Sequence, residues 1–219
     1  MMPPAGLCRG RWSKAKRAAP DPAGEKRPPG GEAGTARGRG LGRDRWGGRS
    51  LFGADLVVGP WGARFRGRIF PCAIGGGGIG EKRAEGDRIT PAGRHRIEAV
   101  LRRPDRRAAG TPATLLPTHA IGPRDGWSDD PADPDYNHPV LRPRRFGHEA
   151  LRRPDRMYDL VAVLDWNRHP PVPGRGSAIF LHVWRRPRHP TAGCVAFRPE
   201  DLAWILRRWT PRDRVVIRG

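Results

Sequence analysis

The chain has 219 residues, enough for one ordinary domain with some excess, and 42 Lys and Arg against 22 Asp and Glu give it a net charge of +20. No run of about 18 apolar residues occurs, which excludes a transmembrane helix. The three cysteines, Cys8, Cys72 and Cys194, cannot all pair within one chain and match no CxxC metal pattern. At least one free thiol is therefore present, and a disulfide framework is not expected.

Residues 1–50 differ in composition from the rest of the chain. They hold twelve Lys or Arg, four Asp or Glu, eleven Gly and six Pro, and their only large aliphatic residues are Leu7 and Leu41. Such a segment buries too little apolar surface to offset its ordering entropy. We therefore predict a disordered basic tail over 1–50, followed by one domain over 51–219.

The positive charge of the tail attracts polyanions, which include nucleic acid and anionic cell wall. The tail has no recognised nucleic-acid-binding module and no regular aromatic spacing, so no specific nucleic acid is expected as a partner. It also lacks the apolar core of a signal peptide, and taken literally it predicts a cytoplasmic protein. A start codon assigned too early would produce the same tail.

The domain begins with predicted strands. The stretches LFGADLVV (51–58) and WGARFRGRIFPCAIG (61–75) are two β-rich runs separated by Gly59-Pro60, which is typical of a hairpin. The stretch RHRIEAVL (94–101) alternates in the manner of a further strand.

Polar stretches separate these strands from the end of the chain. Four glycines at 75–78 lead into the turn-rich segment 81–93, and they lack the Lys-Ser/Thr pair and the helix of a phosphate-binding loop. The segment from Arg102 to about Asp155 is a long polar excursion of the kind used for function or for lids. The hexapeptide LRRPDR occurs at 101–106 and again at 151–156 without similarity in the flanks, and we interpret it as Arg-rich bias at two strand exits.

The last sixty residues carry the clearest pattern. Strands are predicted in YDLVAVLDWN (158–167), SAIFLHVW (177–184), CVAF (194–197) and RVVI (214–217). One helix is predicted to begin at Pro199 and to end before Thr210-Pro211. Its apolar stripe is Leu202, Ile205, Leu206 and Trp209. Six or seven strands against one helix predict a mostly β domain.

Cys194 and His182 are a candidate nucleophile and base. A thiol attacks a carbonyl as the thiolate, which requires a nearby base, and His182 ends a predicted strand twelve residues before Cys194. Ala192 and Gly193 are small enough to let backbone N–H groups approach an oxyanion. The residues alone leave two other readings open: a buried cysteine with a strand-end histidine, or a zinc site that adds His169 and His189.

Several segments resemble the L,D-transpeptidase (YkuD-type) family. The stretches GSAIFLHV (176–183) and TAGCVAF (191–197) resemble its catalytic signature, a His followed by Ser/Thr-x-Gly-Cys. The segment GDRITPAG (86–93) resembles the family's acidic, Gly-rich Thr-Pro turn, and GWSDDPADPDYN (126–137) and YDLVAVLDWN (158–167) resemble stretches in a bacterial branch of it. The resemblance covers roughly 51–219.

The resemblance implies a β-sandwich or barrel-like sheet domain with one C-terminal helix. It implies acyl transfer on peptidoglycan stem peptides, in which Cys194 forms a thioester, His182 is the base, and the backbone around Thr191, Gly193 and Cys194 supports the oxyanion. No cofactor and no metal are expected. A monomer in the periplasm or cell envelope is expected, although no export signal is visible. Hydrolysis of the same peptides by an L,D-carboxypeptidase or amidase is the alternative, and a catalytically idle cell-wall or polyanion-binding protein is another.

Two positions depart from the family pattern, because Ala192 and Ala196 stand where a His and an Arg are common. The candidate contacts for a substrate carboxylate are therefore nearby arginines, which could equally be solvated: Arg185, Arg186, Arg188 and Arg198. A backbone carbonyl near the preceding strand is expected to orient His182, with Ser177 as a side chain close by. Three residues of the long excursion are expected either to line a substrate wall or to pin the loop to the body: Trp127, Tyr136 and Asn137.

Overall fold

The fold is described over residues 54–106 and 113–219 of a computed structural model. The predicted tail over 1–50 lies outside these ranges. Within them the chain forms sixteen short strands and one helix, which confirms the mostly β class.

Two large sheets form the body of the domain. The six-stranded sheet has the order β4 (Cys72–Ala73), β15 (Val195–Phe197), β14 (Phe180–Val183), β13 (Leu160–Leu164), β8 (Ile97–Arg102) and β9 (Thr118–Ala120). The five-stranded sheet has the order β3 (Arg68–Phe70), β2 (Gly62–Phe65), β1 (Leu56–Gly59), β16 (Val215–Ile217) and β7 (Gly93–His95). A two-stranded parallel ladder joins β5 (Ile79–Gly80) to β6 (Thr90–Pro91).

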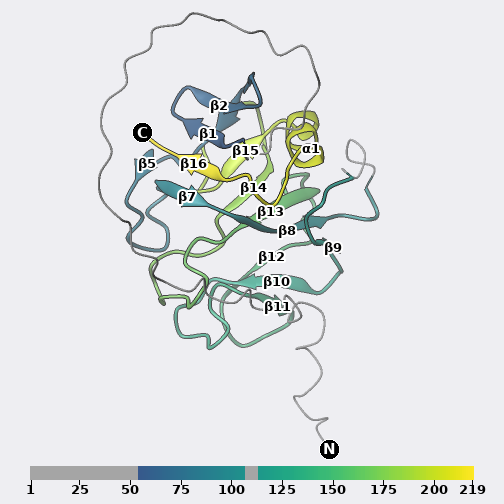
Figure 1. The fold of residues 1–219 in the computed structure, drawn as a ribbon. Coiled ribbons are helices and arrows are strands. Elements are labelled where there is room, and N and C mark those ends of the chain that lie inside the picture. Colours follow the sequence, from purple (N-terminus) through teal and green to yellow (C-terminus); the bar gives the residue numbers. More distant parts are fainter. Residues whose placement is uncertain (1–53, 107–112) are drawn as a thin grey trace, which may run out of the picture. The chain divides into compact units, whose positions relative to one another are not determined.

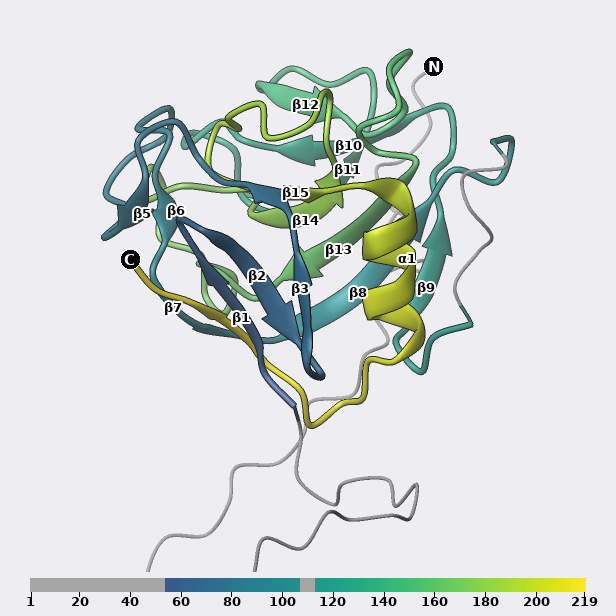
Figure 2. The ribbon, with the colours of Figure 1, turned by 90° about the horizontal axis from the view of Figure 1, so that it is seen from above.

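The main hydrophobic core lies between the two large sheets. Leu56 and Phe65 enter it from the five-stranded sheet, and Leu160 and Leu181 enter it from the six-stranded sheet. The helix α1 (Pro199–Arg207) closes one side with Leu206 and its buried neighbours. Figure 2 shows β1 to β3 crossing in front of β13 and β8, with α1 beside them.

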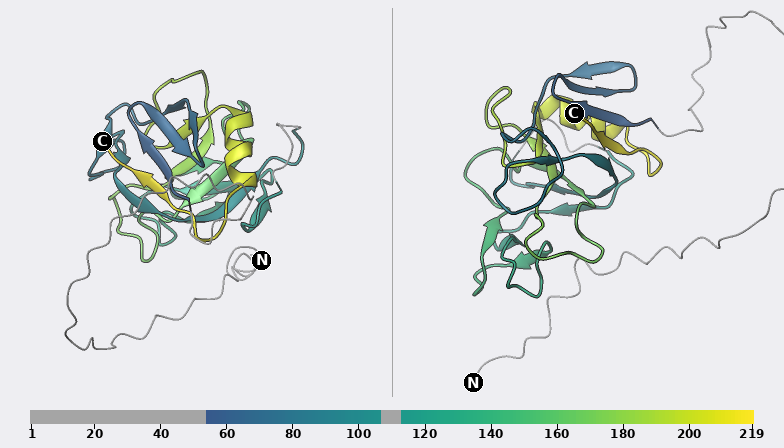
Figure 3. Two further views of the ribbon diagram at one scale, coloured as in Figure 1. Left: turned by 45° about the horizontal axis from the view of Figure 1, so that its top comes forward. Right: turned by 90° about the vertical axis from the view of Figure 1, so that its left-hand side faces the viewer.

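The opposite face of the six-stranded sheet is covered by a small sheet. This three-stranded sheet has the order β11 (Pro139–Leu141), β10 (Asp125–Ser128) and β12 (His148–Ala150), and Figures 1 and 3 show it on the side away from β1 and β2. The Trp127 ring packs edge-on against the Phe180 ring, with 4.9 Å between their centroids. The predicted excursion over 102–155 thus contains regular structure, and both faces of the central strands β13, β14 and β15 are buried.

The strand predicted over 94–101 is divided in the structure. Residues 93–95 pair with β16 in one large sheet, whereas residues 97–102 pair with β13 in the other. Between them, the Arg96 N–H donates to the Asp165 carboxylate at 3.0 Å, and the Arg96 carbonyl accepts the Asp165 N–H at 3.1 Å. The chain therefore passes from one sheet to the other at Arg96.

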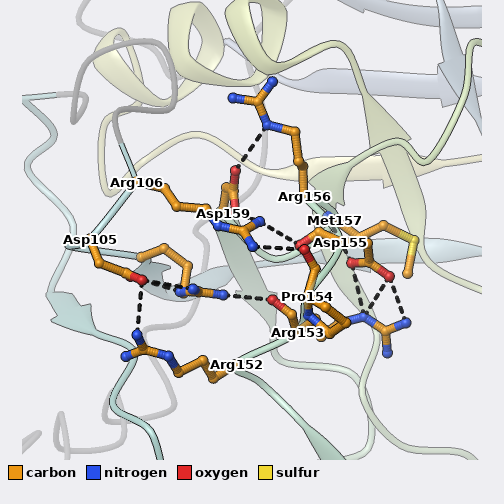
Figure 4. Close-up of polar contacts among 10 residues, drawn as sticks. Asp105, Arg106, Arg152, Arg153, Pro154, Asp155, Arg156, Met157 and Asp159 are labelled. Carbon is orange, nitrogen blue, oxygen red and sulfur yellow. Dashed lines mark hydrogen bonds and ion pairs between the residues drawn. The ribbon is translucent and has the colours of Figure 1, made fainter.

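The two LRRPDR copies lie side by side (Figure 4). Both copies lie at strand exits, as predicted, since the first begins with the last two residues of β8 and the second directly follows β12. In each the third residue forms an ion pair with the fifth: Arg103 with Asp105 and Arg153 with Asp155. The Arg103 guanidinium also donates to the Arg153 carbonyl at 2.7 Å, and Arg152 pairs with Asp105 across the copies at 2.9 Å. The repeated motif therefore forms a clamp between two distant parts of the chain.

Candidate active site

Alternation along β14 and β15 places Cys194 and His182 on the same face of the six-stranded sheet. Leu181 and Val195 point into the main core, so His182, which follows Leu181, and Cys194, which precedes Val195, point to the other face. The strands are parallel, and their register pairs His182 with Ala196, two residues beyond Cys194. The thiol and the imidazole therefore come from neighbouring strands, and both line one cavity.

Backbone groups at the start of β14 and just before it hold the sulfur of Cys194. The thiol donates to the Ala178 carbonyl at 3.1 Å, and the Phe180 N–H donates to the sulfur at 3.4 Å. Burial raises the pKa of the thiol to about 12, against the smaller opposing effect of the Phe180 N–H. The resting thiol is therefore protonated at neutral pH.

The ring of His182 is held by its own strand. Its Nδ1 lies 2.8 Å from the Val183 carbonyl oxygen. Because a carbonyl only accepts, Nδ1 carries the proton and Nε2 keeps its lone pair. Burial lowers the pKa of the imidazole to about 4, so the ring is neutral at pH 7 and can accept a proton. The orienting group is a backbone carbonyl, but it belongs to β14 rather than to the preceding strand, and the Ser177 side chain is not the partner of Nδ1.

The turn before Cys194 is fixed by Thr191 and Gly193. The Thr191 hydroxyl accepts the Gly193 N–H at 3.1 Å and donates to the Cys194 carbonyl at 2.6 Å. Gly193 has a φ of +140°, and a Cβ there would lie 2.9 Å from the Ile89 carbonyl oxygen, so the position requires glycine. The Gly193 N–H must leave Thr191 before it can bind an oxyanion.

Ile89 belongs to the segment GDRITPAG, so two of the motifs that carried the family resemblance meet at this turn. The family model described as the YkuD L,D-transpeptidase catalytic domain matches residues 62–217, more than half of the chain. The chain belongs to the YkuD family. Comparison with curated proteins and with solved structures gives no match. The matched region begins at β2 and ends with β16, so it includes every described strand except β1, and it includes both Cys194 and His182.

Tyr158 forms a wall of the cavity beside His182. Its ring meets the His182 ring edge-on at a centroid distance of 5.5 Å, and its hydroxyl donates to Glu149 Oε1 at 2.9 Å. Arg153 donates to the same oxygen at 3.2 Å and lies 5.4 Å over the Tyr158 ring. Since Arg153 belongs to the second LRRPDR copy, the clamp described above anchors this wall.

The cavity in front of the pair has a volume of about 330 Å³. Three of the predicted substrate contacts or supporting residues line it: Ser177, Arg185 and Thr191. Three predicted arginines are exposed and do not line it: Arg186, Arg188 and Arg198. Ala196, which stands where the family commonly has an arginine, is part of the wall.

The aromatic and amide residues predicted from the long excursion are buried instead. Trp127, Tyr136 and Asn137 are each 1% exposed and do not line this cavity. The Tyr136 hydroxyl donates to Glu85 at 2.5 Å and accepts the Gly176 N–H at 3.1 Å. These contacts agree with the expectation that the three residues pin the loop to the body, and not with the expectation that they line a substrate wall.

Sequence reasoning missed five polar or aromatic residues of the wall: Lys82, Glu85, Asp129, Glu149 and Tyr158. Lys82 is almost fully buried and pairs with Asp87 at 2.5 Å. Burial and the charge of Glu85 raise the pKa of Asp129, and burial raises the pKa of Glu149. Asp129 and Tyr158 lie inside stretches that resemble the family, whereas Glu149 lies in no recognised motif.

A zinc site is not supported by the geometry. Within residues 54–106 and 113–219, no group of three or more His, Cys, Asp or Glu side chains is placed to hold a metal ion. His182, His189 and Cys194 share the cavity, but the His169 ring contacts the Glu98 carboxylate.

Proposed function

We propose that this YkuD domain is a cysteine acyltransferase that acts on peptidoglycan stem peptides by L,D-transpeptidation. The observation that carries the proposal is that the Cys194 thiol and the neutral His182 imidazole line the same cavity from neighbouring parallel strands. Family membership supports the substrate class.

The first half-reaction follows from the protonation states. Both groups are neutral at rest, so proton transfer to His182 Nε2 accompanies attack of the sulfur on the donor peptide carbonyl. Collapse of the tetrahedral intermediate breaks the peptide bond. The departing amine of the D-amino acid takes the proton from the imidazolium, and the acyl group remains on Cys194 as a thioester.

In the second half-reaction an amine attacks the thioester and loses its proton to His182. The sulfur leaves and recovers that proton, which completes the new amide bond and restores the thiol. The carboxylates of Glu85, Asp129 and Glu149 line the cavity and attract an ammonium group more strongly than water. The ammonium group gives up one proton to solvent before it attacks as the neutral amine. This wall supports transfer to an amine rather than hydrolysis.

Arg185 is the predicted arginine that supports contact with a donor carboxylate. It lines the cavity next to the base, where a guanidinium can form two parallel hydrogen bonds to a carboxylate. Arg185 is therefore placed to take the role of the arginine that the family commonly has at the position of Ala196.

The substrate implies that the protein acts in the cell envelope, where YkuD enzymes typically work. Among the residues that the structure describes, no helix is long and apolar enough to cross a membrane, and α1 has nine residues.

A test incubates the full chain with a stem tetrapeptide donor and an amine acceptor, and follows D-alanine release and the cross-linked product by mass spectrometry. Cys194→Ala and His182→Gln are expected to lose both products by about a thousandfold or more. Cys72→Ala is the matched control, since this second buried cysteine does not line the cavity. Full activity of Cys194→Ala would contradict the proposal, and D-alanine release without a cross-linked product would identify the hydrolase instead.

A further inference from the structure

Asn137 joins three segments of the fold through its side chain. Its Oδ1 accepts the Trp127 indole N–H at 3.0 Å and the Ala178 N–H at 3.1 Å. Its Nδ2 donates to the carbonyls of Trp166 and Asn167, at 3.0 and 2.7 Å. Two donors and two acceptors is the full capacity of a carboxamide, so every polar group of this buried side chain is used.

One of those bonds fixes an uncommon backbone conformation. Ala178 has a φ of +52°, in the left-handed region that an alanine rarely adopts. The bond from its N–H to Asn137 Oδ1 holds it there. The fold therefore maintains a strained residue two positions before β14.

That residue touches the nucleophile directly. The Ala178 carbonyl accepts the Cys194 thiol, and two residues later the Phe180 N–H donates to the same sulfur. Two hydrogen bonds, both made by the backbone of Ala178, therefore connect the Asn137 carboxamide to the Cys194 sulfur. Trp127, the second donor to Oδ1, packs on the Phe180 ring, so the same brace supports both groups that contact the sulfur.

We propose that Asn137 is a positioning residue for Cys194, which holds the Ala178–Phe180 segment so that the sulfur stays in its attacking position. The inference rests on the proposed role of Cys194 as the nucleophile. Asn137 touches no substrate in this proposal, because it does not line the cavity. It acts through the backbone of Ala178.

The experiment compares Asn137→Gly with the wild-type full chain. Asn137 has a φ of +57°, which glycine adopts without strain, so the variant removes the carboxamide and keeps the backbone. Acyl transfer is expected to lose about tenfold or more in kcat, with KM within about threefold, because the loss is one of orientation. Alkylation of Cys194 by iodoacetamide at pH 7.5, read on its tryptic peptide, is expected to become about tenfold faster, because the hydrogen bond that favours the protonated thiol is loosened.

Val215→Ala is the stability control, since it opens a comparable void in the five-stranded sheet away from the cavity. A folded Asn137→Gly with kcat and alkylation rate both within about twofold of the control would overturn the proposal. If Asn137→Gly does not fold, Asn137→Asp decides, since it keeps the acceptor for Ala178 and loses both donors. The proposal then expects kcat and alkylation rate within about twofold of the control, and a tenfold change in either would overturn it, because the bond to Ala178 would not explain the effect. The alkylation comparison needs no substrate, so it judges Asn137 even if Cys194→Ala shows that the proposed function is wrong.

Discussion

The buried imidazole of His182 makes the stability of the domain depend on pH. Burial lowers its pKa from 6.5 to about 4, whereas in the unfolded chain the ring titrates near 6.5. Between these values the unfolded state binds a proton that the folded state does not, so the free energy of unfolding falls as the pH falls. The full effect is about 3 kcal/mol, present above pH ~6.5 and lost by pH ~4, and about 2 kcal/mol of it disappears between pH 7 and pH 5.

Urea unfolding of the wild type and of His182→Gln, each at pH 7 and pH 5, measures this effect. Carboxylates with shifted pKa values contribute equally to both proteins, so the quantity of interest is the difference between their pH dependences. We expect the wild type to lose about 2 kcal/mol more than the variant over this range. His169→Gln, which changes a largely exposed ring, controls for the substitution itself. Equal pH dependences in the wild type and His182→Gln would refute the lowered pKa.

Three further outcomes follow from the site. Gly193→Ala would hold an alanine at a φ of +140° with its Cβ against the Ile89 carbonyl. We expect the free energy of unfolding to fall by about 1–3 kcal/mol and acyl transfer to slow. Unchanged urea unfolding would show that the turn can relax. Cys194, with a pKa of about 12, should react with iodoacetamide about a thousandfold more slowly at pH 7 than the same residue in urea-unfolded protein, and fast labelling would indicate a resting thiolate. Arg103→Leu removes the bond to the Arg153 carbonyl and should cost about 1–2 kcal/mol in thermal or urea unfolding, whereas no loss would mean that the clamp adds nothing to stability.

The elements with strong local patterns were predictable from the sequence. The helix begins at Pro199 and buries Leu202, Ile205 and Leu206 as its spacing indicates, and β13, β14 and β16 fall inside the predicted runs. The division between β7 and β8 was not predictable, because the group that interrupts the ladder at Arg96 is Asp165, far along the chain. Strands β10 to β12 are short and lie among charged residues, so their pairing depends on burial against β14 rather than on local propensity.

The candidate site also contains residues that the sequence predicts and residues that it does not. Cys194 and His182 carry a recognisable motif, and the alternation of their strands indicates a shared face once the strands are known to be neighbours. Glu149, Tyr158 and Asn137 act through contacts with residues far away in the sequence, and no spacing rule predicts those contacts. The LRRPDR repeat likewise resembles compositional bias in the sequence, because the contacts between its two copies join residues about fifty positions apart.

Burial also determines the charge state of Cys194 and His182. Burial is the largest cause of both the raised pKa of Cys194 and the lowered pKa of His182, and the face they share is the one under the three-stranded sheet. The motif thus supplies the sulfur and the nitrogen, and burial within the fold keeps them as a neutral thiol and a neutral imidazole. In the proposed reaction the proton leaves the sulfur as the sulfur attacks, so the donor carbonyl has to lie against the sulfur before the thiolate forms. The same burial protects the resting thiol from oxidants, which act on the thiolate.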